Sequence, residues 1–72
     1  MNYNFIFDNI TVILNFMEAK AISVAYNFDV QTQSVDFIAV YALGEKIQKR
    51  LSMSEIERMS HKDIVNFVNK FF

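Results

Sequence analysis

The residues best suited to bind a charged partner are three cations close together in the sequence, Lys46, Lys49 and Arg50. On a helix these positions share one face, opposite Ile47 and Leu51, and they would contact phosphates or an acidic partner there. Three cations without stacking or base-reading partners carry little specificity, and an ordinary solvated helix face has the same composition. The cluster is therefore a candidate contact for an acidic partner, with nucleic acid as a less favoured one.

Ser60, His61 and Asp63 have the residue types of a nucleophilic triad, but their spacing does not suit one. Triad residues converge from separate segments, whereas neighbours in the first turn of a helix point in different directions. The chain has one histidine and no cysteine, so a metal site of the usual ligands is not expected. Glu55 and Glu57 lie two residues apart and face away from each other on a helix. We therefore expect no enzymatic activity, no cofactor, no metal and no small-molecule substrate.

Aromatic residues are frequent near the N-terminus and again in the following segment. At alternate positions they would share one face of a strand. Stacking on nucleic-acid bases requires exposed rings in a basic groove, and the first aromatic segment contributes no Lys or Arg. Packing in a core or a dimer is the favoured role. The candidate apolar interface comprises Tyr3, Phe5, Phe7, Tyr26, Phe28 and Phe72.

Length and composition favour one small domain that associates with another protein. The chain has 72 residues, 53% of them apolar, and no cysteine that would form a disulfide. A core of this size supplies little stability, so small domains usually need a further source of stability. Without a disulfide or a metal site, self-association is the source that remains. The sequence predicts a homo-oligomer or a stable complex with a protein partner. The net charge of −1 provides no global field that would attract nucleic acid.

The chain carries no sign of export or membrane insertion. Its first residues lack a basic region and a small-residue cleavage site, which a signal peptide would have. Its apolar runs are shorter than the roughly 18 residues of a membrane-spanning helix. We therefore expect a cytoplasmic protein with no membrane partner.

Alternation of apolar residues with period two predicts strands before Gly44, the only glycine. The segment 35–41 is apolar on both faces toward its end, so we expect it at the centre of the sheet. Three polar stretches between the strands have the length of hairpin turns. The predicted strands are Tyr3 to Phe7, 10–16, 22–28 and 35–41, with turns at Asp8-Asn9, 18–20 and 30–34.

Residues 8–28 also fit a helix that would begin after a cap at Asp8. Apolar residues recur there at helical spacing. Against the helix stand many β-branched side chains, whose stiffness favours strands. We favour strands and keep the helix as the alternative. The residues at helical spacing are Ile10, Ile13, Leu14, Met17, Ala21, Val24, Ala25 and Phe28.

The residues after Gly44 favour helices. Residues 45–51 are good helix formers with Ile47 and Leu51 one turn apart. Ser52 with Glu55, and Ser60 with Asp63, have the spacing of capping boxes and predict two further helix starts. The last helix would bury one apolar stripe. That stripe comprises Ile64, Phe67, Val68 and Phe71.

The sequence thus predicts a single α+β domain over residues 1–72, with 1–43 mainly strands and 44–72 mainly helices. An antiparallel sheet of three or four strands would be followed by two or three short helices packed on one face, and the alternative is an all-α bundle. We expect a non-catalytic interaction module, an inhibitor or adaptor that acts through an apolar surface and self-associates. Small regulators carried by phages or mobile elements are examples of this class. The alternative function is a nucleic-acid-associated regulator that uses the basic cluster.

Overall fold

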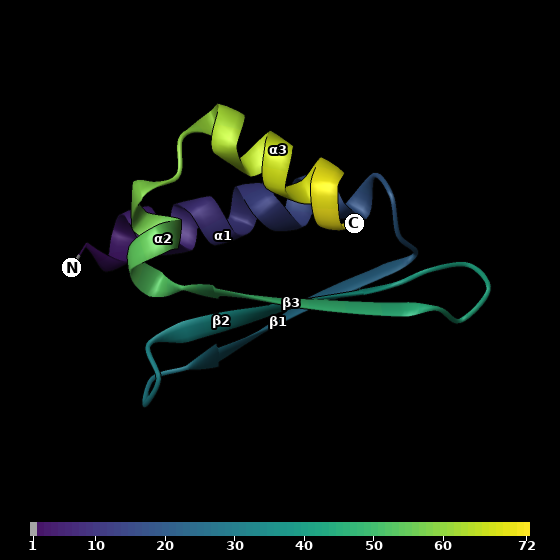
Figure 1. Cartoon of the computed structure of the whole chain (residues 1–72), viewed down its shortest axis with the longest axis horizontal. Coiled ribbons are helices and arrows are strands. Elements are labelled where there is room, and N and C mark those ends of the chain that lie inside the picture. The colour runs from purple at the N-terminus through teal and green to yellow at the C-terminus, as the bar shows by residue number, and fades with distance from the viewer. Residues whose placement is uncertain (1) are drawn as a thin grey trace.

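The computed structural model describes residues 2–72, in which three helices lie on one side of an antiparallel sheet (Figure 1). The strands follow one another in the sheet in sequence order, so β2 is central and β1 and β3 are the edges. Within these residues the other face of the sheet carries no helix (Figure 1). The elements are α1 (Tyr3–Glu18), β1 (Ser23–Asp29), β2 (Ser34–Val40), β3 (Lys46–Ser52), α2 (Met53–Arg58) and α3 (His61–Phe71).

The prediction of strands over residues 3–7 and 10–16 is wrong, because α1 occupies this region. The helix begins at Asn2, whose side chain accepts hydrogen bonds from the backbone N–H groups of Asn4 and Phe5, so the expected cap at Asp8 is also wrong. Helix propensity is a weak preference that burial overrides, and one face of α1 is buried along its whole length. The predicted turns at Asp8-Asn9 and 18–20 therefore do not exist as hairpins. The buried residues are Ile6, Ile10, Ile13 and Met17.

The predicted strands over 22–28 and 35–41 are confirmed with small shifts at their ends. They form β1 and β2, paired antiparallel with Tyr26 opposite Phe37. The turn between them is closed by Asp29, whose side chain accepts from the backbone N–H groups of Gln31 and Thr32. The central position expected for 35–41 is also confirmed, since β2 pairs on both sides.

The helix predicted over 45–51 is wrong, because these residues form the edge strand β3. Gly44 has a positive φ of 85° and closes the β2–β3 hairpin. Its N–H donates to the Tyr41 carbonyl, and the Tyr41 N–H donates to the Glu45 carbonyl. Ile47 and Leu51 are four residues apart, a spacing that places them on one face of a strand as well as of a helix, and pairing with β2 decides between the two.

Both predicted helix starts after β3 are confirmed. The Ser52 hydroxyl accepts from the Glu55 N–H at 3.1 Å and begins α2. Ser60 and Asp63 form a complete capping box at the start of α3, with both bonds present. The expected apolar stripe of α3 is buried at Ile64, Phe67 and Val68.

The core lies between the sheet and the helices, centred on β2. Val35, Phe37 and Ala39 have no exposed surface and face the helices. The rings of Phe37 and Phe67 meet edge to face, which ties α3 to β2. The α+β class is thus confirmed, with a three-stranded antiparallel sheet followed by two short helices, and an additional helix precedes the sheet. The all-α alternative is excluded.

We expect Ser60→Ala to lower the free energy of unfolding by about 1 kcal/mol, because the first turn of α3 loses its cap. Chemical denaturation followed by circular dichroism measures this change. Asn66→Ala is the matched control on the exposed side of the same helix and should cost little or nothing. Equal stability of Ser60→Ala and the parent protein would contradict a stabilising role for the cap.

Candidate functional site

The three cations of the predicted basic cluster lie on strand β3 and not on one helix face. Alternate residues of a strand point to opposite faces, so Lys46 and Arg50 lie on the uncovered face of the sheet and Lys49 on the helix-covered face. The ammonium group of Lys49 lies 4.9 Å from the centre of the Phe71 ring. The structure therefore divides the cluster between two faces and does not form the single basic surface expected from the sequence.

Arg50 is already paired within the sheet. Its Nε and Nη2 donate to the two carboxylate oxygens of Asp36 at 2.8 and 2.9 Å, directly across from it on β2. This bidentate hydrogen bonding holds the pKa of the Asp36 carboxyl below its usual value, against the opposing effect of burial. The Arg50 charge is thus largely engaged with Asp36, which leaves less of it for an external phosphate.

The positions of these cations are of the kind that protects an edge strand from pairing with another strand. Natural sheets guard an edge with lysines and with charged side chains that point inward. Lys46 is exposed on this edge, and Lys49 points inward beneath Phe71. A strand added beside β3 would confine the Lys49 ammonium group. The cations thus have a structural role that their composition alone does not reveal.

The opposite edge, strand β1, has no such protection. It runs for seven residues without Lys, Arg or Pro, and no other strand in residues 2–72 pairs with its free side. Ladder geometry shows which backbone groups are free. The hydrogen bond from the Tyr41 N–H to the Glu45 carbonyl shows that the odd-numbered residues of β2 direct their backbone groups toward β3. The even-numbered residues of β2 therefore bond to β1, at Ser23, Ala25, Asn27 and Asp29. The N–H and C=O groups of Val24, Tyr26 and Phe28 therefore point out of the sheet.

A row of apolar side chains accompanies these free backbone groups on the helix-covered face. The row comprises Val24, Tyr26 and Phe28, and the exposed Ile22 and Val30 flank β1 at its two ends. Ile22 is 70% exposed, Tyr26 40% and Val30 69%, whereas the neighbouring side chains of β2 are fully buried. The helices therefore cover β2 and leave the helix-facing side of β1 partly exposed to solvent. We call this row, with the free backbone of β1, the open edge.

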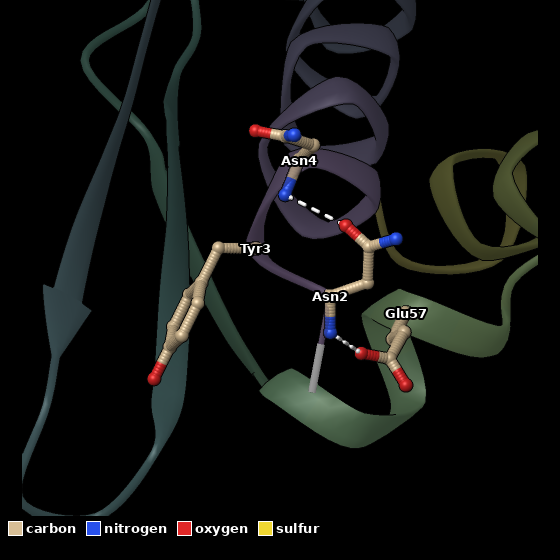
Figure 2. A pocket seen from close by; sticks show the side chains of 4 residues that line it. All are labelled: Asn2, Tyr3, Asn4 and Glu57. Carbon is tan, nitrogen blue, oxygen red and sulfur yellow. Dashed lines mark hydrogen bonds between the residues drawn. The ribbon is translucent and has the colours of Figure 1, made fainter.

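Two aromatic side chains of α1 extend the open edge. The rings of Phe7 and Phe28 stack with centres 5.4 Å apart, and Phe7 remains 44% exposed. Tyr3 lies one turn earlier on the same side of α1 and is 52% exposed. In Figure 2 the Tyr3 ring points away from Asn2 and Glu57, toward the strands. Four of the six predicted interface residues thus lie together: Tyr3, Phe7, Tyr26 and Phe28.

The other two predicted interface residues lie elsewhere. Phe5 is exposed but lies two residues from Phe7, on another side of α1. Phe72 is half-buried, its ring contacts Phe67, and its carbonyl accepts from the Tyr41 hydroxyl at 2.7 Å. Ile22 and Val30 are exposed apolar residues at the two ends of β1 that the sequence did not single out. Only the order of the strands shows that β1 is an edge.

A shallow hollow lies at the start of α1, lined by Asn2, Tyr3, Asn4 and Glu57 (Figure 2). The Glu57 carboxylate accepts from the Asn2 backbone N–H and so joins α2 to this end of α1. The polar groups that line the hollow are already engaged, since the Glu57 carboxylate joins the two helices and the Asn2 side chain caps α1. The hollow is open, and we assign it no ligand.

The residues that resembled a triad serve the start of α3. Ser60 and Asp63 cap each other's backbone, which holds the pKa of the Asp63 carboxyl below its usual value because the Ser60 N–H donates to it. The His61 ring meets Phe16 of α1 edge to face. Within residues 2–72 no group of three His, Asp or Glu side chains has the geometry of a metal site. None of the helices in this range has the length and apolar character needed to cross a membrane.

Comparison with protein-family models, with curated proteins and with solved structures finds no match. The open edge is therefore defined only by its own geometry and chemistry, as exposed apolar side chains beside free backbone groups.

We expect the protein to lose stability in acid through three carboxyls. Hydrogen bonds lower the pKa of Asp29, Asp36 and Asp63 in the folded state. Their contribution is present above the unfolded value of about 3.9 and is lost as the pH falls through the lower folded values. Urea midpoints between pH 7 and pH 2 measure this loss. Asp36→Asn should show a shallower acid dependence, and an unchanged dependence would contradict the role of the Arg50 pair.

We expect the double substitution Lys46→Thr with Lys49→Val to produce larger assemblies, because it removes both charges that protect the β3 edge. Light scattering at increasing concentration measures assembly size. Lys20→Thr with Lys62→Val is the matched control, since it removes the same charge from exposed positions outside the sheet. Equal assembly of the two variants would show that net charge, and not the edge, controls association.

Proposed function

We propose that this protein is a small non-catalytic interaction module, an inhibitor or adaptor, that binds another polypeptide along the open edge. The observation that carries the proposal is the free backbone of Val24, Tyr26 and Phe28 beside exposed aromatic rings. An extended segment that adds to a sheet edge gains main-chain hydrogen bonds, and alternate side chains supply specificity. Both features are available here on one strand.

The distribution of exposed apolar residues supports this surface. Soluble monomers rarely expose contiguous apolar patches of large size, and those that do usually bind something there. Tyrosine and phenylalanine are enriched at the centres of such interfaces. Of the large apolar side chains that are exposed within residues 2–72, only Phe5 and Leu43 lie away from the open edge. Those that border it are Tyr3, Phe7, Ile22, Tyr26 and Val30.

Nucleic acid is not supported as a second candidate partner. The idea rested on one basic face, and the structure separates Lys49 from Lys46 and Arg50. Arg50 is paired with Asp36, and Lys49 lies against Phe71. A phosphate backbone is bound by several cations along one groove, and these contacts leave Lys46 as the free cation of the predicted cluster.

Photo-crosslinking tests the proposal in the cells that produce the protein. A photoreactive phenylalanine analogue at Tyr26 should give a discrete protein adduct, because this position lies at the centre of the open edge. The same analogue at Gln48, which is exposed on the uncovered face of the sheet, is the control and should give none. Absence of an adduct at position 26, or equal yields at both positions, would overturn the proposal.

A further inference from the structure

We infer that the segment bound along the open edge is the same edge of a second copy of this chain. The inference rests on the proposed function and adds the identity of the partner. The two β1 strands would pair antiparallel about a two-fold axis at Tyr26, so that the two sheets join into one. A two-fold interface uses the same patch on both subunits, so the patch has to be complementary to itself.

The side chains of the open edge meet this condition. About an axis at Tyr26, the two Tyr26 side chains become neighbours, and Val24 lies opposite the partner's Phe28. Ile22 and Val30 lie just beyond the ends of the paired strands and add exposed apolar surface there. Every cross-strand pair on the helix-covered face is therefore apolar or aromatic, and such pairs stabilise a sheet. A different axis would remove at least one of these pairs from the joined edges.

The backbone groups of the open edge are also complementary to themselves. In an antiparallel ladder, residues directly opposite one another alternate between pairs that exchange both hydrogen bonds and pairs that exchange none. Val24, Tyr26 and Phe28 are the β1 residues whose groups point outward. An axis at Tyr26 places these three residues opposite one another, so each of them exchanges both bonds. The same register thus satisfies the side chains and the backbone.

The uncovered face carries no charge conflict in this register. Ala25 comes opposite the partner's Asn27, and Ser23 opposite the partner's Asp29. Asp29 is the only charged residue of β1, and its two copies lie at opposite ends of the seam. Like charges directly opposite each other would destabilise the pairing, and here there are none.

The helices leave room for the second strand. Tyr26 is exposed on the helix-covered face, so α1 does not close over the free side of β1 at the centre of the strand. In the dimer the two α1 helices lie on the same side of the joined sheet and flank the seam. Tyr3 and Phe7 then border the paired strands and contribute further apolar surface.

The difference between the two edges makes this assembly finite. Pairing of β1 with the partner's β3 would repeat from copy to copy and produce rings or filaments. The inward Lys49 and the exposed Lys46 disfavour that contact. Pairing of β1 with β1 uses both open edges and leaves only the protected β3 edges at the ends of the sheet. A closed dimer follows.

Light scattering of the purified chain tests the assembly. We expect a mass twice the 8.4 kDa of one chain. Tyr26→Lys should raise the dissociation constant of the dimer by about 30-fold or more, the scale of a residue at an interface centre. Phe5→Lys is the matched control, an exposed aromatic residue of α1 outside the open edge, and should remain dimeric. A monomer at all concentrations up to about 0.5 mM would overturn the inference.

Engineered cysteines test the register without altering the aromatic row. Ala25 and the partner's Asn27 form a pair without mutual hydrogen bonds, with Cα atoms about 4.5 Å apart, which a disulfide spans. Mixed Ala25→Cys and Asn27→Cys chains should therefore form a disulfide-linked dimer on mild oxidation. Either variant alone should not, because each cysteine lies diagonally from its own copy, about 7–8 Å away. Equal cross-linking by Ala25→Cys alone would exclude an axis at Tyr26.

Amide hydrogen exchange separates failure of this inference from failure of the proposed function. In the dimer the N–H groups of Val24, Tyr26 and Phe28 should exchange slowly, and dilution should release them. Fast exchange of these three amides at high concentration would show that no second copy is bound. If the analogue at Tyr26 still yields an adduct with a different protein, the proposed function holds and only the self-pairing is wrong.

Discussion

Burial of one face of β2 is the constraint on which the rest of the structure depends. Val35, Phe37 and Ala39 have no contact with solvent. A strand buried in this way needs hydrogen-bonding partners on both sides and an apolar layer above it. The hairpins supply β1 and β3, and the three helices supply the layer. Helix α1 is held in this layer by its own apolar face, although its β-branched residues favour strands in isolation.

The same constraint produces an asymmetry between the two edges of the sheet. A chain of this length has enough helix to cover the centre of the sheet, but the inner side of β1 stays partly exposed. The two edges therefore meet solvent with different side chains. On β3 the inward position is Lys49, packed against Phe71, and on β1 the corresponding position is Tyr26. One edge resists a further strand, and the other presents apolar rings beside unpaired backbone groups.

The proposed self-pairing would account for the composition of the chain. A core this small contributes limited stability, and the sequence has no disulfide. Association through an edge adds main-chain hydrogen bonds and apolar burial to the folded state without a larger core. The proposed self-pairing thus links the high apolar fraction, the absence of cysteine and the protected β3 edge to one physical requirement.

The sequence by itself determined the features that depend on local interactions. The caps at Ser52 and Ser60, the hairpin after Asp29 and the central position of 35–41 need only neighbouring residues or the composition of one segment. Tertiary structure alone decided the remaining elements. Residues 3–18 and 45–51 have patterns that fit either a helix or a strand, and the packing of α1 and the pairing of β3 with β2 chose between them. The open edge could not be predicted for the same reason, because a strand becomes an edge only through the order in which strands pair.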